Sequence, residues 1–417
     1  MTETTPDPQH PEQVVIVGGG LAGAGTAVAL RDQGYTGSIV VFAAENHVPY
    51  ERPPLSKGYL KGETVASEGE VKPQDWYAAH DVDLRLGTAV TAVEHEAHQV
   101  VSTDGGRTAY DRLVIATGSS PRRADLPGHD LGGVLSLRTI EDSDALKAAF
   151  GSGARIVIIG AGWIGLEVAA AARDAGASVT VLESAEQPLL AVMGATVGAF
   201  FATLHRDHGV DLRLGVEVAS IEAAEGSRKV GSVTLVDGTS IPADLVVVAI
   251  GATPNTDLAV TAGLDVDNGI LVDSQGRSSD PDIFAVGDVA NAETPSFGGR
   301  LRVEHWANAL DRPASVARGV LGQEGGFDKL PFFYSDQYDL GLEYSGHASP
   351  TDELVVRGDF DSKEFLAFWL DGDTVRAGLN VNVWDVQDDI QELIASKAPV
   401  DRAKLANPEV ALKDTKA

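Results

Sequence analysis

The sequence predicts an α/β protein in which one strand–helix–strand design occurs twice, followed by a smaller α+β domain at the C-terminus. Three observations predict this fold. Two glycine-rich loops, at residues 18–23 and 160–165, each follow an apolar, strand-like run. Two later segments, 110–118 and 243–251, repeat a buried strand that ends in glycine. After a glycine- and charge-rich boundary at 323–329, short apolar runs indicate antiparallel strands.

Both glycine loops read G-x-G-x-x-G and open an alanine-rich, helical stretch. The backbone of such a turn can approach a pyrophosphate only where side chains are absent, and the helix N-terminus behind it adds a positive dipole end. Glycine also marks ordinary tight turns, but here each loop has the strand–turn–helix context that dinucleotide binding requires. The two halves are therefore predicted to be Rossmann-like dinucleotide-binding domains.

An acid follows the second strand of each half. Glu45 follows the run 40–42, and Glu183 follows the run 179–182. A carboxylate roughly 20 residues past the loop is suited to the ribose hydroxyls. Glu183 also favours NADH over NADPH, because a carboxylate repels a 2′-phosphate and residues 184–193 contain no arginine or lysine. Two dinucleotides on one chain imply electron transfer between them.

Further elements follow in order. Residues 283–288 read as a buried strand with an acid at its carboxyl end. The C-terminal part is expected to hold paired antiparallel strands and a closing helix; the strands are at 354–360, 364–369 and 374–380, and the helix is at 388–394.

The composition excludes several classes of function and of binding partner. The 417 residues are enough for two or three domains. With no cysteine, the chain cannot hold a disulfide, a cysteine-bound iron–sulfur cluster or a redox-active cysteine pair, so disulfide reductases and single-cysteine peroxidases are excluded, and no bound metal is expected. The net charge of −29, from 61 acids and 32 bases, disfavours nucleic acid and anionic membranes as partners.

The N-terminal segment, residues 1–11, is polar and contains proline, so we expect a loose tail and not a signal peptide. No apolar run reaches the ~20 residues that span a bilayer. The cytoplasm is the expected location.

Residues 50–57 combine prolines with two bases, Arg52 and Lys57. The prolines fix an extended approach, and Leu55 can begin a helix. A cation here could stabilise an anionic reduced flavin. The alternative is a surface loop with two solvated bases.

Six segments in this order carry a family resemblance: Pro-Tyr-Glu-Arg-Pro-Pro-Leu-Ser-Lys at 49–57, Ala-Thr-Gly at 116–118, 160–167, Ala-Val-Gly-Asp at 285–288, Val-Glu-His-Trp at 303–306 and 334–338. From about residue 12 to about residue 410, the chain resembles the FAD-dependent ferredoxin reductases of bacterial oxygenase systems. These are the putidaredoxin-reductase type within the pyridine nucleotide-disulfide oxidoreductase superfamily.

The resemblance implies a glutathione-reductase-like fold. Residues 12–118 and 248–325 would form a discontinuous FAD-binding domain, 119–247 the NADH-binding domain and 326–417 the C-terminal α+β domain. The residues implied at the FAD are Gly18, Gly20, Leu21, Ala22, Gly23, Glu45, Arg52, Lys57, Val90, Ala116, Thr117, Gly118, Arg122, Asp288, Glu304 and Trp306. Those implied at the NAD are Gly160, Gly162, Trp163, Ile164, Gly165, Glu167, Glu183 and Gly251.

Lys57, Glu167 and Trp306 are the implied residues closest to the chemistry. Without the resemblance, Trp306 could be a core aromatic, Asp288 a strand-end turn residue and Glu167 a surface helix acid. Two positions depart from the family pattern: Ala44 stands where an acid is usual, and Tyr334 where tryptophan is frequent.

The implied activity is that of an NADH-dependent ferredoxin reductase with non-covalent FAD. NADH would pass a hydride to the flavin, and electrons would go singly to a [2Fe–2S] ferredoxin that feeds an oxygenase, a haem-thiolate monooxygenase or a dioxygenase. The alternatives are an NADH diaphorase or oxidase, an NADH-sensing flavoprotein resembling apoptosis-inducing factor, and the reductase subunit of a nitrite or nitrile system. Five bases are candidates for docking the ferredoxin: Arg52, Lys57, Arg300, Arg302 and Arg312.

Overall fold

The computed structural model describes residues 11–417, so the predicted N-terminal tail lies almost wholly outside the described residues. The chain forms two compact units. The first comprises the chain up to Glu51 together with Ala66–Ser120 and Thr253–Pro331. The second comprises Arg52–Val65, Pro121–Ala252 and Phe332–Ala417. The finer division into three domains stays a prediction.

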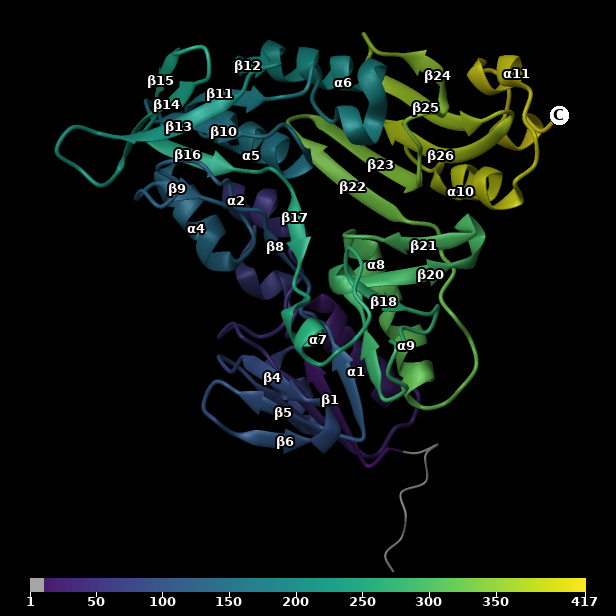
Figure 1. Ribbon diagram of the computed structural model, residues 1–417. Coiled ribbons are helices and arrows are strands. Elements are labelled where there is room, and N and C mark those ends of the chain that lie inside the picture. The colour runs from purple at the N-terminus through teal and green to yellow at the C-terminus, as the bar shows by residue number, and fades with distance from the viewer. Residues whose placement is uncertain (1–10) are drawn as a thin grey trace, which may run out of the picture. The chain divides into compact units, whose positions relative to one another are not determined.

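A five-stranded parallel sheet forms the centre of the first unit (Figure 1). Its strands, in spatial order, are β19 (Ile283–Ala285), β7 (Arg112–Ile115), β1 (Gln13–Val17), β2 (Ser38–Phe42) and β3 (Val82–Arg85). The central strands are continuous β-branched and aliphatic runs, which suits a parallel sheet buried on both faces. Helix α1 (Leu21–Asp32) joins β1 to β2 and packs beside α9 (Pro313–Val320).

Two small three-stranded sheets and three short helices complete the first unit. One sheet contains β4 (Val90–Glu94), β5 (Gln99–Ser102) and β6 (Arg107–Ala109), and the other contains β18 (Ile270–Val272), β20 (Ala290–Thr294) and β21 (Gly299–Arg302). The helices are α3 (Gln74–Ala79), α7 (Asp257–Thr261) and α8 (Trp306–Asp311).

The second unit repeats the parallel design. Its sheet contains β12 (Asp211–Leu214), β11 (Ser178–Glu183), β10 (Arg155–Ile159), β16 (Leu245–Val248) and β9 (Val134–Leu135). A three-stranded antiparallel sheet again accompanies it, made of β13 (Val218–Ala223), β14 (Val230–Leu235) and β15 (Ser240–Pro242). The helices are α2 (Gly58–Lys61), α4 (Ile140–Ala149), α5 (Trp163–Asp174) and α6 (Leu190–Asp207). The short strands β8 (Ser119–Pro121) and β17 (Ala252–Pro254) lie where the chain passes between the units.

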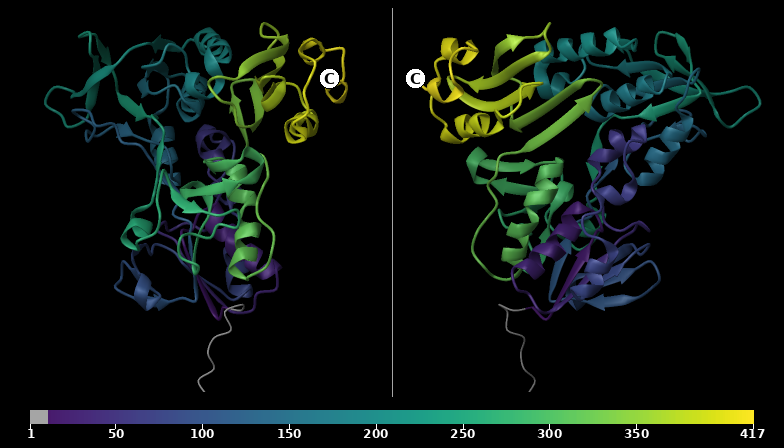
Figure 2. Two further views of the ribbon diagram at one scale, coloured as in Figure 1. Left: turned by 45° about the vertical axis from the view of Figure 1, so that its right-hand side comes forward. Right: turned by 180° about the vertical axis from the view of Figure 1, so that it is seen from behind.

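The C-terminal part of the second unit is an antiparallel sheet. Its order is β22 (Phe332–Gln337), β23 (Leu340–Gly346), β26 (Thr374–Val381), β25 (Glu364–Asp371) and β24 (Glu353–Asp359). Helix α10 (Gln387–Ser396) packs against β23 and β26, and α11 (Arg402–Ala406) packs against β24 (Figure 2). The three predicted strands and the closing helix are confirmed, as is the α/β fold with a C-terminal α+β part.

The two parallel sheets match at the level of single hydrogen bonds. The Gly18 amide donates to the Phe42 carbonyl at 2.9 Å, and the Gly160 amide donates to the Leu182 carbonyl at 2.8 Å. Each glycine loop therefore leaves the carboxyl end of the middle strand of its sheet, where neighbouring strands on the two sides connect in opposite directions. Open parallel sheets bind ligands at this point.

Candidate active site

The first glycine loop contains glycines with two different functions. Gly18 has a φ of +124°, and a Cβ there would lie 2.1 Å from the Ala116 carbonyl oxygen. A Cβ at Gly23 would lie 1.9 Å from the Gly18 carbonyl oxygen. Gly20 has an ordinary φ of −83°, and a Cβ there would meet no protein atom within 4 Å. The chain's own packing requires glycine at Gly18 and Gly23, and it does not require glycine at Gly20.

The second loop repeats this division. Gly160 has a φ of +103°, and its Cβ would lie 2.4 Å from the Ala249 carbonyl oxygen. A Cβ at Gly165 would lie 2.2 Å from the Gly160 carbonyl oxygen. Gly162, with a φ of −78°, again has open space where a Cβ would stand.

Gly20 and Gly162 are the N-caps of α1 and α5, and neither helix is capped there by a side chain. Backbone N–H groups at a helix N-terminus attract an anion, and a missing side chain lets a phosphate come close. The residues present therefore fit a dinucleotide pyrophosphate at both loops.

The two predicted ribose acids have different surroundings. One Glu183 carboxylate oxygen accepts the Ala161 amide at 2.7 Å, inside the second loop, and the other accepts the Ala185 amide at 2.9 Å. Glu45 instead accepts the Tyr50 hydroxyl at 2.6 Å. The position in the first sheet that corresponds to Glu183 at the end of β11 is the residue directly after β2. That residue is the buried Ala43. The second loop thus has a carboxylate bonded to its own backbone.

Other predicted FAD residues in the first unit gather around the ends of β7 and β19. The Thr117 hydroxyl donates to the Asn255 carbonyl at 2.8 Å, and the Asn255 side chain donates back to the Thr117 carbonyl at 2.8 Å. The Asp288 carboxylate accepts the Ser119 hydroxyl at 2.8 Å. Asn255 and Ser119 were not predicted, although the sequence places each beside a strand-then-glycine segment.

Five other predicted residues of the first unit lie in or beside its helices and strands. Leu21 and Ala22 begin α1 and are buried, Ala116 and Gly118 flank Thr117, and Val90 begins β4. Glu304 forms an ion pair with Arg302. Trp306 begins α8, is half-buried, and donates its indole N–H to the Glu51 carboxylate at 2.9 Å. A fully buried core aromatic is therefore not the right description of Trp306.

A buried ion pair is the main polar feature of the second unit. The Glu167 side chain on α5 is 3% exposed, and its carboxylate lies 2.8 Å from the Lys57 ammonium, which is 14% exposed. Ser56 and Ser335 also donate to this carboxylate, the latter at 2.5 Å. A buried charge is tolerated only when it is paired and hydrogen-bonded. Glu167 is thus not a surface acid, and Lys57 is not a solvated base.

The loop that carries Lys57 explains its position. Residues Pro53–Ser56 form a short 3-10 turn, and α2 begins directly after Lys57, so the helix predicted from Leu55 is interrupted there. Lys57 has a φ of −125° and a ψ of −118°, and its ammonium lies 5.4 Å from the centre of the Tyr334 ring. Tyr334, which stands where tryptophan is frequent, therefore belongs to the same cluster.

The remaining predicted residues of the second unit are less closely associated. The Arg52 guanidinium donates to the Arg138 carbonyl, and the amide of the exposed Arg122 donates to the Gly251 carbonyl at 2.9 Å. Gly251 has a φ of +102° and open space beside it. At the start of α5, the Trp163 ring packs on Phe201 and Phe333, whereas Ile164 is 43% exposed.

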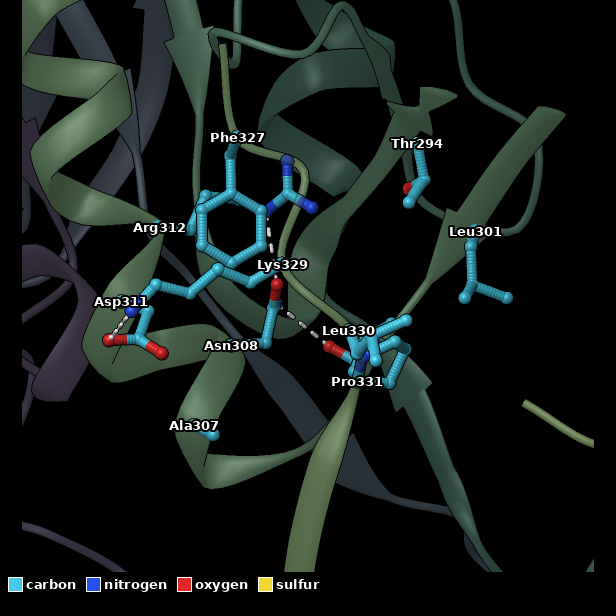
Figure 3. Close-up of a pocket in the computed structure, with 11 residues that line it drawn as sticks. Thr294, Leu301, Ala307, Asn308, Asp311, Arg312, Phe327, Lys329, Leu330 and Pro331 are labelled. Carbon is cyan, nitrogen blue, oxygen red and sulfur yellow. Dashed lines mark hydrogen bonds and ion pairs between the residues drawn. The ribbon is translucent and has the colours of Figure 1, made fainter. Parts of the chain in front are cut away.

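The prediction that five bases form a docking patch is wrong for Arg312. Its side chain is 2% exposed, lies under the Phe327 ring at 4.3 Å and donates to the Asn308 side chain at 3.0 Å (Figure 3). Burial lowers the pKa of Arg312 to about 10. Three of the other bases are paired with carboxylates: Lys57 with Glu167, Arg300 with Glu293 and Arg302 with Glu304. Sequence alone did not reveal these partners.

Two family models together match nearly the whole described chain. Residues 12–312 match the pyridine nucleotide-disulphide oxidoreductase model, and residues 332–416 match the reductase C-terminal model. The chain belongs to the pyridine nucleotide-disulphide oxidoreductase family. Since it has no cysteine, it lacks the disulfide chemistry in the family's name.

The chain is similar to named reductases over nearly their full length. It is 39% identical to putidaredoxin reductase of Pseudomonas putida, over 97% of this chain and 96% of that protein. It is 41% identical to the ferredoxin–NAD(+) reductase component of the anthranilate 1,2-dioxygenase system of Burkholderia cepacia, over 96% and 98%. The fold matches the reductase in a covalent putidaredoxin reductase–putidaredoxin complex with a TM-score of 0.94, at 38% identity, over 97% and 98% of the two chains. The predicted resemblance to ferredoxin reductases is confirmed.

Within residues 11–417, no helix is both long and apolar enough to cross a bilayer. The same residues contain no group of three or more histidine, aspartate or glutamate side chains placed to hold a metal ion.

Proposed function

We propose that the chain is an NADH-dependent, FAD-containing ferredoxin reductase that supplies electrons to an oxygenase. The observation that carries this proposal is the pair of matched loops. In each, one glycine, Gly20 or Gly162, caps a helix N-terminus and leaves open space where a side chain would stand, which suits the close approach of a phosphate. The absence of cysteine restricts the family's chemistry to electron transfer without a disulfide. Full-length similarity to proteins named ferredoxin reductases supports the choice of acceptor.

In this proposal the first loop holds FAD and the second holds NADH. Gly20 leaves room for the FAD pyrophosphate, Asp288 accepts a hydrogen bond from the ribityl chain, and Trp306 lies near the nicotinamide and flavin. FAD, when bound, accepts two electrons together and releases them singly, which is the conversion that a one-electron iron–sulfur partner needs. Residues 12–118 with 248–325, 119–247 and 326–417 are the proposed FAD, NADH and C-terminal domains.

Glu183 is the proposed determinant of the nicotinamide cofactor. Its carboxylate is fixed by the Ala161 and Ala185 amides, so its position at the second loop does not depend on the ligand. A fixed negative charge accepts ribose hydroxyls and repels a 2′-phosphate. NADH is therefore the proposed electron donor.

Lys57 and Glu167 are the proposed residues closest to the reaction. The Lys57 ammonium, held by the Glu167 carboxylate at 2.8 Å, is a fixed positive charge with little solvent around it. Positive charge of this kind stabilises negative charge that develops during reduction, because screening by water is weak at a buried site. The predicted cytoplasmic location remains a prediction.

The acceptor tests this proposal. The FAD-loaded chain, given NADH under anaerobic conditions, is expected to reduce a [2Fe–2S] ferredoxin with a kcat/KM well above that for a soluble quinone. Oxygen consumption without ferredoxin is expected to be slow. Equal or better reduction of quinone or oxygen would identify a diaphorase or oxidase and reject the proposal. The same chain stripped of FAD serves as the control for direct reduction by NADH.

A further inference from the structure

The buried ion pair is the end of a longer hydrogen-bonded chain inside the second unit. The Ser335 hydroxyl bonds to the Glu167 carboxylate at 2.5 Å, and the Gln337 side-chain amide bonds to Ser335 at 3.2 Å. Gln337 Oε1 lies 2.8 Å from His205 Nε2, and the Tyr338 hydroxyl lies 3.2 Å from His205 Nδ1. Four elements, α5, β22, α6 and the turn after β22, thus contribute to one network.

The network is dry. Ser335, Gln337 and His205 are each 0% exposed, and Glu167 is 3% exposed. Polar groups without solvent must satisfy each other, so a missing member leaves its neighbours unpaired. These side chains are therefore fixed as a group.

Chemistry determines the direction of every bond. The Glu167 carboxylate accepts from the Lys57 ammonium, so Ser335 must use its single proton to donate to Glu167. The Ser335 oxygen then accepts from the Gln337 NH₂ group, which turns Gln337 Oε1 toward His205. His205 therefore carries its proton on Nε2, and its bare Nδ1 accepts from the Tyr338 hydroxyl.

The histidine is neutral in this arrangement. Burial lowers the pKa of His205 to about 4, and the neighbouring His208 acts in the same direction. Tyr338 is held over His205 by stacking on the His208 ring, with centroids 3.7 Å apart. Tyr338 also has a φ of +58°, a backbone conformation that is unfavourable for a bulky side chain. The turn therefore keeps the contacts of Tyr338 with the two histidines despite an unfavourable backbone conformation.

All donors point toward Glu167, and the Gln337 amide cannot pass a proton without becoming an imidic acid. The chain is therefore not a proton wire. What it can do is fix the Glu167 carboxylate, and through it the Lys57 ammonium, by an anchor on α6 that is remote in sequence.

We propose that Gln337 and His205 are positioning residues for the reaction: they orient Ser335 and Glu167 and so hold the Lys57 ammonium in its working position. The inference rests on the proposed function, because it assigns these residues to the NADH-dependent reduction step. They are expected to affect kcat and not the binding of NADH.

Two measurements on the FAD-loaded protein test the proposal. Nitrogen-15 NMR of labelled histidine should show His205 as the Nε2–H tautomer, its signal identified by its absence in a His205→Asn variant. In Gln337→Met, which keeps the length of the side chain and removes its hydrogen bonds, kcat for NADH-to-ferricyanide turnover should fall about fivefold to tenfold, the effect of one lost hydrogen bond. KM for NADH should stay within about twofold.

Gln387→Met is the matched control. Gln387 on α10 also bonds through both ends of its amide, to Ser345 and Asn380, without joining the network. Its kcat should equal that of the unaltered protein. An Nδ1–H tautomer at His205 would reverse the bond directions and overturn the proposal, and so would equal kcat values for Gln337→Met and Gln387→Met.

The tautomer measurement needs no variant at position 337, so an Nδ1–H tautomer would overturn the proposal even if Gln337→Met does not fold. Failure of the proposed function would look different: the unaltered protein would oxidise NADH or bind it without reducing a ferredoxin, while the His205 tautomer would still report on the network.

Discussion

The backbone amide of Ala161 donates to the Glu183 carboxylate across 2.7 Å, so the second glycine loop holds its own acid in place. This contact predicts cofactor choice. NADH should be preferred over NADPH at least about tenfold in kcat/KM, equivalent to roughly 1.4 kcal/mol. Glu183→Gln should narrow the ratio, because it removes the charge that repels a 2′-phosphate.

Glu186→Gln is the control for this change, since it removes an equal charge from an exposed side chain three residues along the same loop. It should leave the ratio unaltered. Steady-state rates with each nucleotide decide the point, and equal kcat/KM values in the unaltered protein would contradict the prediction.

The purified protein should be yellow with FAD that is bound without a covalent link. The described chain contains no cysteine, which removes one side chain to which a flavin could be attached. Acid precipitation should release all the flavin into the supernatant, where chromatography identifies it. Flavin retained on the pellet, or FMN in place of FAD, would be inconsistent with the two-loop assignment.

Removal of one partner from the Lys57–Glu167 pair should be costly for stability. Glu167→Ala leaves a buried ammonium without its counter-charge, and we expect a loss of about 3–5 kcal/mol. Lys57→Met combined with Glu167→Leu should recover part of that loss, because no buried charge remains. Chemical denaturation of the unaltered protein and of these two variants gives the comparison.

The Lys61–Asp174 pair provides the contrast within the same unit. Its side chains are 23% and 44% exposed, so Asp174→Ala should cost less than about 1 kcal/mol. Similar losses for Asp174→Ala and Glu167→Ala would show that burial of the Lys57–Glu167 pair does not matter energetically.

His205 predicts a dependence of stability on pH. Its pKa is lowered by burial to about 4 in the folded protein, whereas an unfolded imidazole has a pKa of about 6.5. Between these values the unfolded chain binds a proton that the folded chain does not, so stability falls as the pH drops from about 6.5 to about 4. Above about 6.5 this effect vanishes.

The size of this component is at most about 3 kcal/mol. His205→Asn should therefore flatten the decline in unfolding free energy over that pH range, although it also weakens the protein overall. Parallel curves for the two proteins across that range would refute a neutral, buried His205.

Sequence reasoning found the parts of the site that are local in the chain. The glycine loops and their acids are spaced by the geometry of one strand–helix–strand unit, so the sequence predicted the two loops. They lie between strands that end at Val17 and Ile159 and helices that begin at Leu21 and Trp163. The position of Glu183 at the end of the second strand was predicted from the same spacing. Glu45 did not take the matching position, because β2 ends at Phe42 and Ala43 follows it.

The contacts between distant segments were not predictable in the same way. Glu167 looked equally suited to a helix surface, and only the fold brings Ser56 and Ser335 to it from segments before and after α5. Nothing in the sequence distinguishes Arg312 from a solvated base, whereas in the fold the Phe327 ring covers its guanidinium. Burial of a polar side chain depends on long-range packing, which leaves no short-range pattern in the sequence.

The most direct test of the central claim uses the two glycines that the chain's own packing does not require. Gly20→Ala and Gly162→Ala have acceptable φ values and open space, so both variants should fold with unchanged or slightly raised stability. Gly18→Ala and Gly160→Ala, with positive φ and a carbonyl oxygen in the way, should be destabilised and serve as controls.

Cofactor content and NADH titration of the two folded variants then separate the sites. Gly20→Ala should purify with little or no FAD. Gly162→Ala should retain FAD, bind NADH at least about tenfold more weakly, and still pass electrons to ferredoxin when reduced chemically. If instead both variants keep full FAD and unaltered NADH affinity, the two loops do not hold two dinucleotides and the assignment of this chain as an NADH-dependent ferredoxin reductase is contradicted.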